Sequence, residues 1–183
     1  MSRRGISLEE ISEDYPIILV DTSALIGKIN REGYDAVRNS ANFFIDYIKN
    51  NRNSFYVTLS VFGEYYNERS LLDAIQSNSR ILQFNGGEKL WYDVLFKQYS
   101  RIRDIFELAE TDYDFLVSGV VLSEARKKPV ALISNDIGIL RSWKFLLIEE
   151  CLSPIEFGFL IRVGNDTFKK ARPPKKLQKI INF

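Results

Sequence analysis

The chain has 183 residues, of which 45% are apolar and 27% charged, and its formal net charge is +1 at pH 7. It contains no histidine and one cysteine, Cys151. These counts exclude a disulfide framework, a Cys/His zinc site and histidine-dependent catalysis such as a Ser-His-Asp triad. No stretch reaches the roughly 18 apolar residues of a membrane span. Because a lone cysteine fits a reducing compartment, we expect a cytoplasmic, globular protein of one domain.

Positive charge is concentrated at the carboxyl end of the chain. Residues 162–183 hold seven Lys or Arg residues against one acid, a net charge of +6, whereas the rest of the chain has a net charge of −5. A basic segment on an acidic body is typical of a nucleic-acid contact, and the alternative is a merely solvated tail. Pro173 and Pro174 favour an extended arm over a helix. We therefore predict a basic tail over 162–183.

The first half of the chain alternates predicted strands with predicted helices. Residues 1–14 are polar and charged, and we expect them to form a loose lead-in. Branched or aromatic apolar runs predict strands, and apolar residues three and four positions apart predict helices. Ser60 is expected to cap a helix that carries Glu64. The elements before that helix are a strand over 17–20, helices over 22–29 and 34–50, and a strand over 55–59.

The second half begins with an expanded helical region over 77–110, in which a loop precedes one long helix over 88–109. Thr111 or Asp112 is expected to start the next helix. Alternating strands and helices predict an α/β domain with a mostly parallel sheet, spanning residues 1–161. The remaining elements are a helix ending near 127, a strand over 130–133, a short helix around 139–140, a strand over 145–148 and an apolar segment over 155–161.

Two carboxylates follow directly on predicted strands, Asp21 after 17–20 and Asp136 after 130–133. Because the carboxyl ends of parallel strands meet at one edge of a sheet, we expect these two side chains to lie close together. Glu64 can face the same edge from the helix after the second strand. Asp114 lies at a helix start, where the helix dipole favours negative charge. The sequence therefore predicts four acids at one edge.

Four neighbouring carboxylates repel one another and raise each other's pKa values, and a bound cation relieves that repulsion. A site of oxygen ligands without histidine selects a hard cation, Mg²⁺ or Mn²⁺. Such metals position a water for in-line attack on a phosphate. The pattern therefore predicts hydrolysis of a phosphodiester.

Each acid also has a purely structural interpretation. Asp21 could be only a helix cap, Glu64 a surface residue, Asp114 a favourable charge in a first helical turn, and Asp136 part of an ordinary turn. Asp112 is two residues from Asp114 and can also cap a helix, so the sequence leaves open whether it joins the site. The ordered appearance of the acids after successive strands favours the functional interpretation.

The motifs around these acids resemble, in this order, the four motifs of PIN domains. They are Val20-Asp21-Thr22-Ser23-Ala24-Leu25, Glu64 after a strand, Thr111-x-x-Asp114, and Leu132-Ile133-Ser134-Asn135-Asp136, and the resemblance covers about residues 16–160. It implies a Rossmann-like, three-layer α/β/α sandwich with a mostly parallel central sheet, and metal-dependent ribonuclease activity. It also implies catalytic and metal-binding roles for four acids and supporting roles for three polar residues: Asp21, Glu64, Asp114 and Asp136, supported by Ser23, Ser134 and Asn135.

The resemblance makes an endoribonuclease dependent on Mg²⁺ or Mn²⁺ the leading hypothesis. The chain is longer than the toxins of toxin–antitoxin pairs in this family, so a toxin and an RNA-processing or decay nuclease both remain open. The implied partners are RNA, a second copy in a homodimer, and an antitoxin or RNA-processing protein. One alternative is a non-catalytic RNA-binding or assembly module on the same fold, and another is a phosphatase-type hydrolase.

Basic side chains are the predicted contacts to RNA phosphates, and such contacts weaken steeply with salt. Aromatic residues, Tyr92 among them, could stack on unpaired bases, and core packing is the alternative for them. The predicted phosphate contacts are Lys28 and Arg141 near the acids, and Lys169, Lys170, Arg172, Lys175 and Lys176 in the tail.

Overall fold

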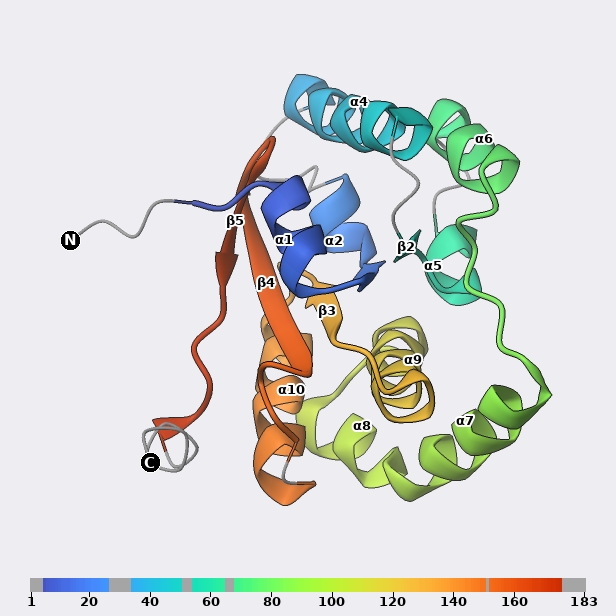
Figure 1. The fold of residues 1–183 in the computed structure, drawn as a ribbon, viewed down its shortest axis with the longest axis vertical. Coiled ribbons are helices and arrows are strands. Elements are labelled where there is room, and N and C mark those ends of the chain that lie inside the picture. Colours follow the sequence, from blue (N-terminus) through green and yellow to red (C-terminus); the bar gives the residue numbers. More distant parts are fainter. Residues whose placement is uncertain (1–4, 27–33, 51–53, 65–67, 151, 176–183) are drawn as a thin grey trace.

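A five-stranded sheet forms the centre of the computed structural model, which describes residues 5–26, 34–50, 54–64, 68–150 and 152–175 (Figure 1). The strand order is β2-β1-β3-β4-β5, with β1 to β4 parallel and β5 antiparallel to β4. The predicted α/β class with a mostly parallel sheet is thereby confirmed. The strands are β1 (Ile17–Val20), β2 (Ser54–Tyr56), β3 (Val130–Ile133), β4 (Phe157–Gly164) and β5 (Thr167–Lys170).

Helices pack against the sheet from two sides in Figure 1, with α1, α2 and α4 above it and α9 and α10 below it. None of the helices in the described ranges has the length and apolar character needed to cross a bilayer. The described helices are α1 (Leu8–Asp14), α2 (Thr22–Leu25), α4 (Tyr34–Asn50), α5 (Leu59–Gly63), α6 (Arg69–Ser77), α7 (Gly86–Gln98), α8 (Ser100–Phe106), α9 (Glu110–Arg126) and α10 (Ile137–Glu149).

The path of the chain through the sheet determines where a ligand can bind. From β1 the chain moves outward to β2, then returns across β1 to β3 and continues to β4. The direction of winding therefore reverses between β1 and β3, and open α/β sheets bind ligands outside the carboxyl ends of strands at such a reversal. Asp21 follows β1 and Ser134 follows β3, so both lie at this position.

The sheet interior follows from strands that are apolar on both faces. All residues of β1 and β3 are buried, as expected for central parallel strands. Along β4 the two faces alternate: Trp143 of α10 contacts the Phe159 ring at a centroid distance of 5.4 Å and donates a hydrogen bond to the Phe157 carbonyl. Gly158, between Phe157 and Phe159, lies against the side chain of Tyr15, the residue that follows α1.

Four predicted elements differ from the structure. The strand expected over 145–148 is wrong, because these residues continue α10, whose buried positions recur at helical spacing. The long helix over 88–109 is two helices that meet at Tyr99. Thr58, not Ser60, caps α5, because its side chain accepts the Val61 amide. The lead-in contains α1, which begins with a Ser7–Glu10 capping box.

The sheet also extends beyond the boundary expected at residue 161. Arg162 lies within β4 and is only 8% exposed. Its guanidinium donates to the carbonyls of Ala24 and Leu25 at the end of α2 and lies 4.6 Å from the Phe44 ring centroid. Arg162, the first basic residue of the expected tail, is therefore a structural residue that joins β4 to α2. The segment through Lys170 belongs to the sheet.

We expect Gly158→Ala to destabilise the fold. An added Cβ would lie 2.4 Å from Cζ and Oη of Tyr15, whose hydroxyl donates to the Pro154 carbonyl at 3.2 Å. Overpacking of this kind costs about 1–3 kcal/mol, which thermal unfolding would show as a lower melting temperature. Gly86→Ala is the matched control, because an added Cβ there has no neighbour within 4 Å. Equal melting temperatures for the two variants would contradict the expectation.

Candidate functional site

Asp21 is the most deeply buried acid of the predicted set, with 2% of its surface exposed. Its Oδ2 accepts hydrogen bonds from Ser23 Oγ at 2.5 Å, Ser134 Oγ at 2.9 Å and the Ser23 amide at 3.2 Å. Burial raises the pKa of Asp21, while the hydrogen bonds from the two serines lower it in part and the charge of Glu64 raises it further. The expected supporting role of the two serines therefore has a direct geometric basis.

The segment after β3 joins Asp136 to the same place. The Asp136 amide donates to Ser134 Oγ at 3.0 Å, and the Asn135 amide donates to Ser23 Oγ at 3.0 Å. Asp136 caps α10, because its Oδ1 accepts the amides of the second and third residues of that helix at 2.6 and 3.1 Å. Asn135 Oδ1 accepts the Arg162 amide at 2.9 Å, so Asn135 ties the loop to β4.

Glu64 reaches this edge from the end of α5, where it forms the C-cap and is exposed. Thr22 Oγ1 donates a hydrogen bond to Glu64 Oε2, which links the end of α5 to the start of α2. Glu64 was expected about one turn into a helix that continues beyond it. In the structure Glu64 instead forms the C-cap of α5, which has five residues. The hydroxyl partner Thr22 was not predicted, although it stands directly beside Asp21 in the sequence.

Asp112, which the sequence left open, lies with these acids. It is the third residue of α9 and is half-buried. Burial first, and then the charges of Asp21, Asp136 and Glu64, raise the pKa of Asp112 to about 7, while a backbone hydrogen bond with Ala109 lowers it in part. The four residues Asp21, Glu64, Asp112 and Asp136 therefore form one electrostatically coupled group, here named the acid cluster.

Asp114 lies elsewhere, although it was the predicted third acid. Its carboxylate accepts hydrogen bonds from the Ser60 and Tyr92 hydroxyls and lines a separate pocket between α5, α7 and α9. Residues two apart on a helix are turned by about 200° from each other. The structure therefore brings Asp112, and not Asp114, to the acid cluster. The feature of the sequence that pointed to Asp112 was its position near the expected start of the helix.

The acid cluster suits a hard divalent cation by its chemistry. Its donors are carboxylate and hydroxyl oxygens. Burial and then repulsion from neighbouring carboxylates raise the pKa of Asp112, and a cation would relieve the repulsion. Within the described ranges, however, no three acidic or cysteine side chains come close enough together to hold a metal ion as they stand. Metal binding would therefore require the carboxylates to move toward one another.

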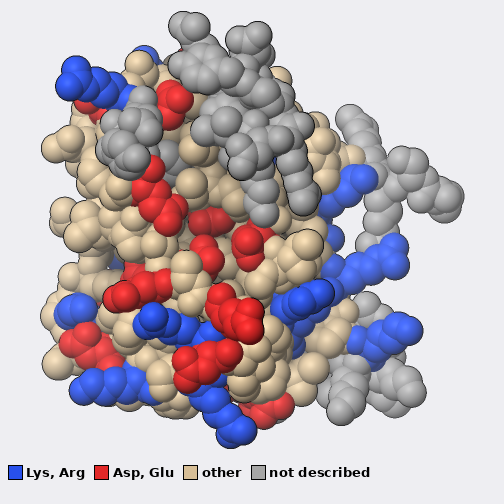
Figure 2. Space-filling view, turned by 180° about the vertical axis from the view of Figure 1, so that it is seen from behind, with Lys and Arg blue, Asp and Glu red and all other residues tan. Residues whose placement is uncertain are grey.

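The predicted phosphate contacts lie in several parts of the molecule. Arg141 is exposed on α10, just over one turn after Asp136. Lys170 forms an ion pair with Asp14 at 2.6 Å. On the face shown in Figure 2, Asp and Glu side chains gather near the centre, and Lys and Arg side chains lie mainly toward the lower and right-hand parts. Lys169, Arg172 and Lys175 are exposed, and Lys28 and Lys176 lie outside the described residues.

Comparison with known proteins gives no assignment. No family model matches this chain, and neither a curated protein nor a solved structure matches it at a significant level. The relation to PIN domains therefore rests on the sequence motifs and stays a prediction. The function has to be argued from the acid cluster and its surroundings.

We expect the Asp112 carboxyl to titrate near pH 7 in metal-free protein, which ¹³C NMR of the carboxyl carbon would measure. Because this pKa lies above the ordinary value of about 3.9, the folded state binds more protons than the unfolded state between about pH 4 and 7. The contribution of Asp112 to stability therefore falls as the pH rises through this window.

Asp112→Asn should remove the loss of stability that the Asp112 carboxyl causes as the pH rises. Its melting temperature should exceed that of the wild type at pH 8 by several degrees, and the difference should shrink toward pH 4, at about 2–4 °C per kcal/mol for a chain of this size. Asp104→Asn, at an exposed position on α8, is the control. A difference that does not change with pH would contradict the raised pKa.

Proposed function

We propose that this protein is an endoribonuclease that depends on Mg²⁺ or Mn²⁺, with a PIN-like, Rossmann-like three-layer α/β/α fold. The observation that carries the proposal is the acid cluster at the winding reversal between β1 and β3, where α/β folds place their ligands. Asp112 takes the role that the sequence motif suggested for Asp114. Whether the protein acts as a toxin or in RNA processing or decay remains a prediction.

Asp21, Asp112 and Asp136 would hold the metal ion, with Glu64 as a further ligand or as the residue that orients the attacking water. When bound, the metal would activate a water and neutralise negative charge on the scissile phosphate. Ser23 and Ser134 fix the orientation of the Asp21 carboxylate.

Two further contacts fix the acids at the edge of this arrangement. Thr22 restrains Glu64 through its hydroxyl, and the first amides of α10 restrain Asp136. Hydrogen bonds within the chain therefore orient Asp21, Glu64 and Asp136. Asp112 has a backbone hydrogen bond with Ala109, and burial followed by the neighbouring charges keeps its pKa raised.

The proposal predicts that single-stranded RNA is cleaved in Mg²⁺ or Mn²⁺ and not in EDTA. Asp21→Asn and Asp112→Asn should each lower the rate at least about 100-fold, because each removes a charged ligand. Asp104→Asn should cleave like the wild type. Metal-dependent cleavage that survives Asp21→Asn would overturn the proposal, because a contaminating nuclease would then explain the activity.

A non-catalytic RNA-binding or assembly module is the second candidate. The observation that favours it is the separation of the acids, since no three of them within the described ranges are arranged to hold a metal ion. Tight RNA binding without metal-dependent cleavage would establish this alternative. Melting temperatures with and without Mn²⁺ would separate the two independently, because only a metal site gives stabilisation that Asp21→Asn abolishes.

RNA affinity should depend on the exposed cations near the carboxyl end. Replacing Lys169, Arg172 and Lys175 with alanine should weaken RNA binding and reduce the slope of log K against log salt by up to about 2, because each phosphate contact on a single strand contributes about 0.7. Lys128→Ala is the control, since Lys128 is an exposed cation outside the carboxyl-terminal segment. An unchanged slope would exclude these residues as phosphate contacts.

A further inference from the structure

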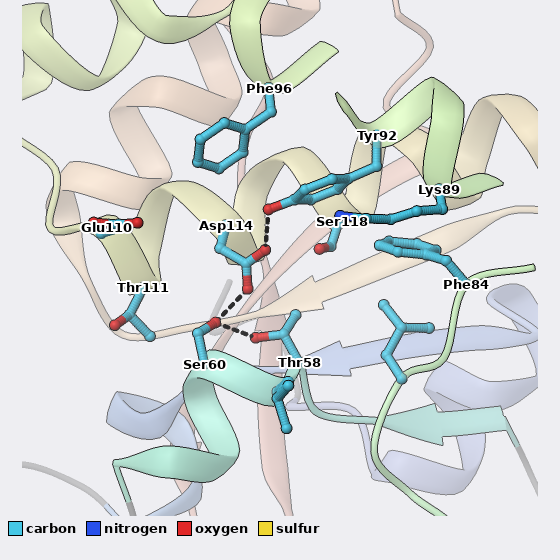
Figure 3. Close-up of a pocket in the computed structure, with 12 residues that line it drawn as sticks. Thr58, Ser60, Phe84, Lys89, Tyr92, Phe96, Glu110, Thr111, Asp114 and Ser118 are labelled. Atoms are coloured by element: carbon cyan, nitrogen blue, oxygen red, sulfur yellow. Dashed lines mark hydrogen bonds between the residues drawn. The ribbon is translucent and has the colours of Figure 1, made fainter. Parts of the chain in front are cut away.

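A cavity of about 620 Å³ lies beside the acid cluster, between α5, α7 and α9 (Figure 3). Polar side chains form one part of its lining, and aromatic rings form another. Leu59, a large apolar side chain that is 69% exposed, also lines this cavity. An aromatic, partly polar cavity with an exposed apolar residue in its lining is typical of a ligand site.

Asp114 is the central polar group of this cavity. One of its carboxylate oxygens accepts the Tyr92 hydroxyl, and the other accepts the Ser60 hydroxyl, which in turn contacts Thr58 Oγ1 at 2.9 Å. Burial and the hydrogen bond to Asp114 raise the pKa of Tyr92, so its phenol stays protonated and continues to donate. A carboxylate has about four lone-pair positions, and two of these remain to accept donors from a ligand.

The aromatic part of the lining is a row of three rings that a base could stack on. The exposed Lys89 side chain lies over one of them, with Nζ 4.5 Å from the Tyr92 centroid, and would move aside for a base to stack there. Phe84 and Tyr92 lie with ring centroids 5.3 Å apart, and Tyr92 and Phe96 are also 5.3 Å apart. All three rings are half-buried and line the cavity. Stacking on aromatic side chains is the usual means by which proteins hold unpaired nucleobases.

The cavity and the acid cluster share two helices. The segment through α5 places Ser60 in the cavity and Glu64 in the cluster, and α9 places Asp114 in the cavity and Asp112 in the cluster. Ser60 and Glu64 are about 6 Å apart along the axis of α5, a distance similar to that between a base and its own phosphate. A nucleotide with its base in the cavity can therefore present a neighbouring phosphate to the acids.

We propose that this cavity binds a single guanine base of single-stranded RNA, with Asp114 as its specificity-determining residue and Phe84 and Tyr92 as its stacking surface. The inference rests on the proposed nuclease function, because it names the nucleotide that the same site recognises. The lining holds two acids, Glu110 and Asp114, and one basic residue, Lys89, so its formal charge is net negative. A net negative lining disfavours a phosphate and favours the uncharged base as the occupant.

Guanine fits the free lone pairs of Asp114 better than the other bases do. Its Watson–Crick edge presents two adjacent donors, N1–H and the 2-amino group, which one carboxylate can accept side by side. Adenine and cytosine place a ring acceptor beside their single amino donor, and uracil places carbonyl oxygens on both sides of its N3–H. These acceptors would face a carboxylate and repel it.

Binding of free nucleoside monophosphates in EDTA tests the inference without metal or cleavage. We expect GMP to bind at least about tenfold more tightly than AMP, CMP, UMP and IMP, which lacks the 2-amino group. Asp114→Asn should lower GMP affinity at least tenfold, whereas Phe84→Leu should weaken all nucleotides by a similar factor, because stacking does not distinguish them.

Asp104→Asn is the control, at an exposed position on α8 outside the cavity lining, and it should bind GMP like the wild type. If Asp114→Asn fails to fold, Tyr92→Phe replaces it, because this change removes one hydroxyl that orients the carboxylate and keeps the ring. It should reduce the preference for GMP over IMP.

Equal affinity for all nucleotides, or GMP binding that Asp114→Asn leaves unchanged, would overturn the inference. So would binding of arginine amide in place of GMP, which would identify the cavity as a site for a cationic side chain of a protein. GMP binding without RNA cleavage would leave this inference standing and refute the nuclease. Metal-dependent cleavage without preference for guanine would support the nuclease and refute this inference.

Discussion

The pairing of β1 with β3 is the constraint on which the candidate site depends. Val20 lies opposite Ile133 in the parallel register, and the Asp21 amide continues the pairing by donating to the Ile133 carbonyl at 3.0 Å. This register brings Asp21 beside Ser134, and the serine hydroxyl satisfies a carboxylate that is almost fully buried. A shift of one residue would turn the side chains of a strand to the other face and separate the two groups.

Hydrogen bonds from other parts of the chain orient three acids of the cluster. Two serines contact Asp21, a threonine hydroxyl contacts Glu64, and the amides of α10 contact Asp136. Burial, followed by the charges of its neighbours, raises the pKa of Asp112 to about 7. Local hydrogen bonds thereby hold the negative charges at separate positions, which explains why they do not converge on one point in the described structure.

Helices α5 and α9 place two kinds of chemistry side by side. On α9, Asp112 belongs to the acid cluster and Asp114, turned by about 200° from it, lines the aromatic cavity. On the segment through α5, Ser60 lines the cavity and Glu64, one turn later, belongs to the cluster. In the proposed function, a carboxylate in the cluster would act on a phosphate, whereas the Asp114 carboxylate, which accepts hydrogen bonds from two hydroxyls, would accept donors from a base. The proposals thus give the same residue type two roles because its neighbours differ.

The sequence by itself determined the parallel α/β class and the strands that precede Asp21 and Asp136, because short branched apolar runs followed by polar residues have few other structures. The resemblance to PIN domains also pointed to Ser23 and Ser134, whose hydroxyls donate to Asp21 in the structure. The sequence could not determine the secondary structure of residues 145–148, since four apolar residues fit a strand or a helix equally well. Packing of Trp143 on β4 favours the helix.

Only the tertiary structure shows that Asp112 and Asp114 have different surroundings. Both stand in the first turns of one helix, and their difference lies in the direction in which α9 is rotated against α5 and α7. That rotation is fixed by the buried side chains of α9 and by hydrogen bonds from Ser60 and Tyr92, which come from distant parts of the chain. Contacts between segments so far apart in sequence leave no local pattern, so the cavity and its proposed ligand became visible only in the folded chain.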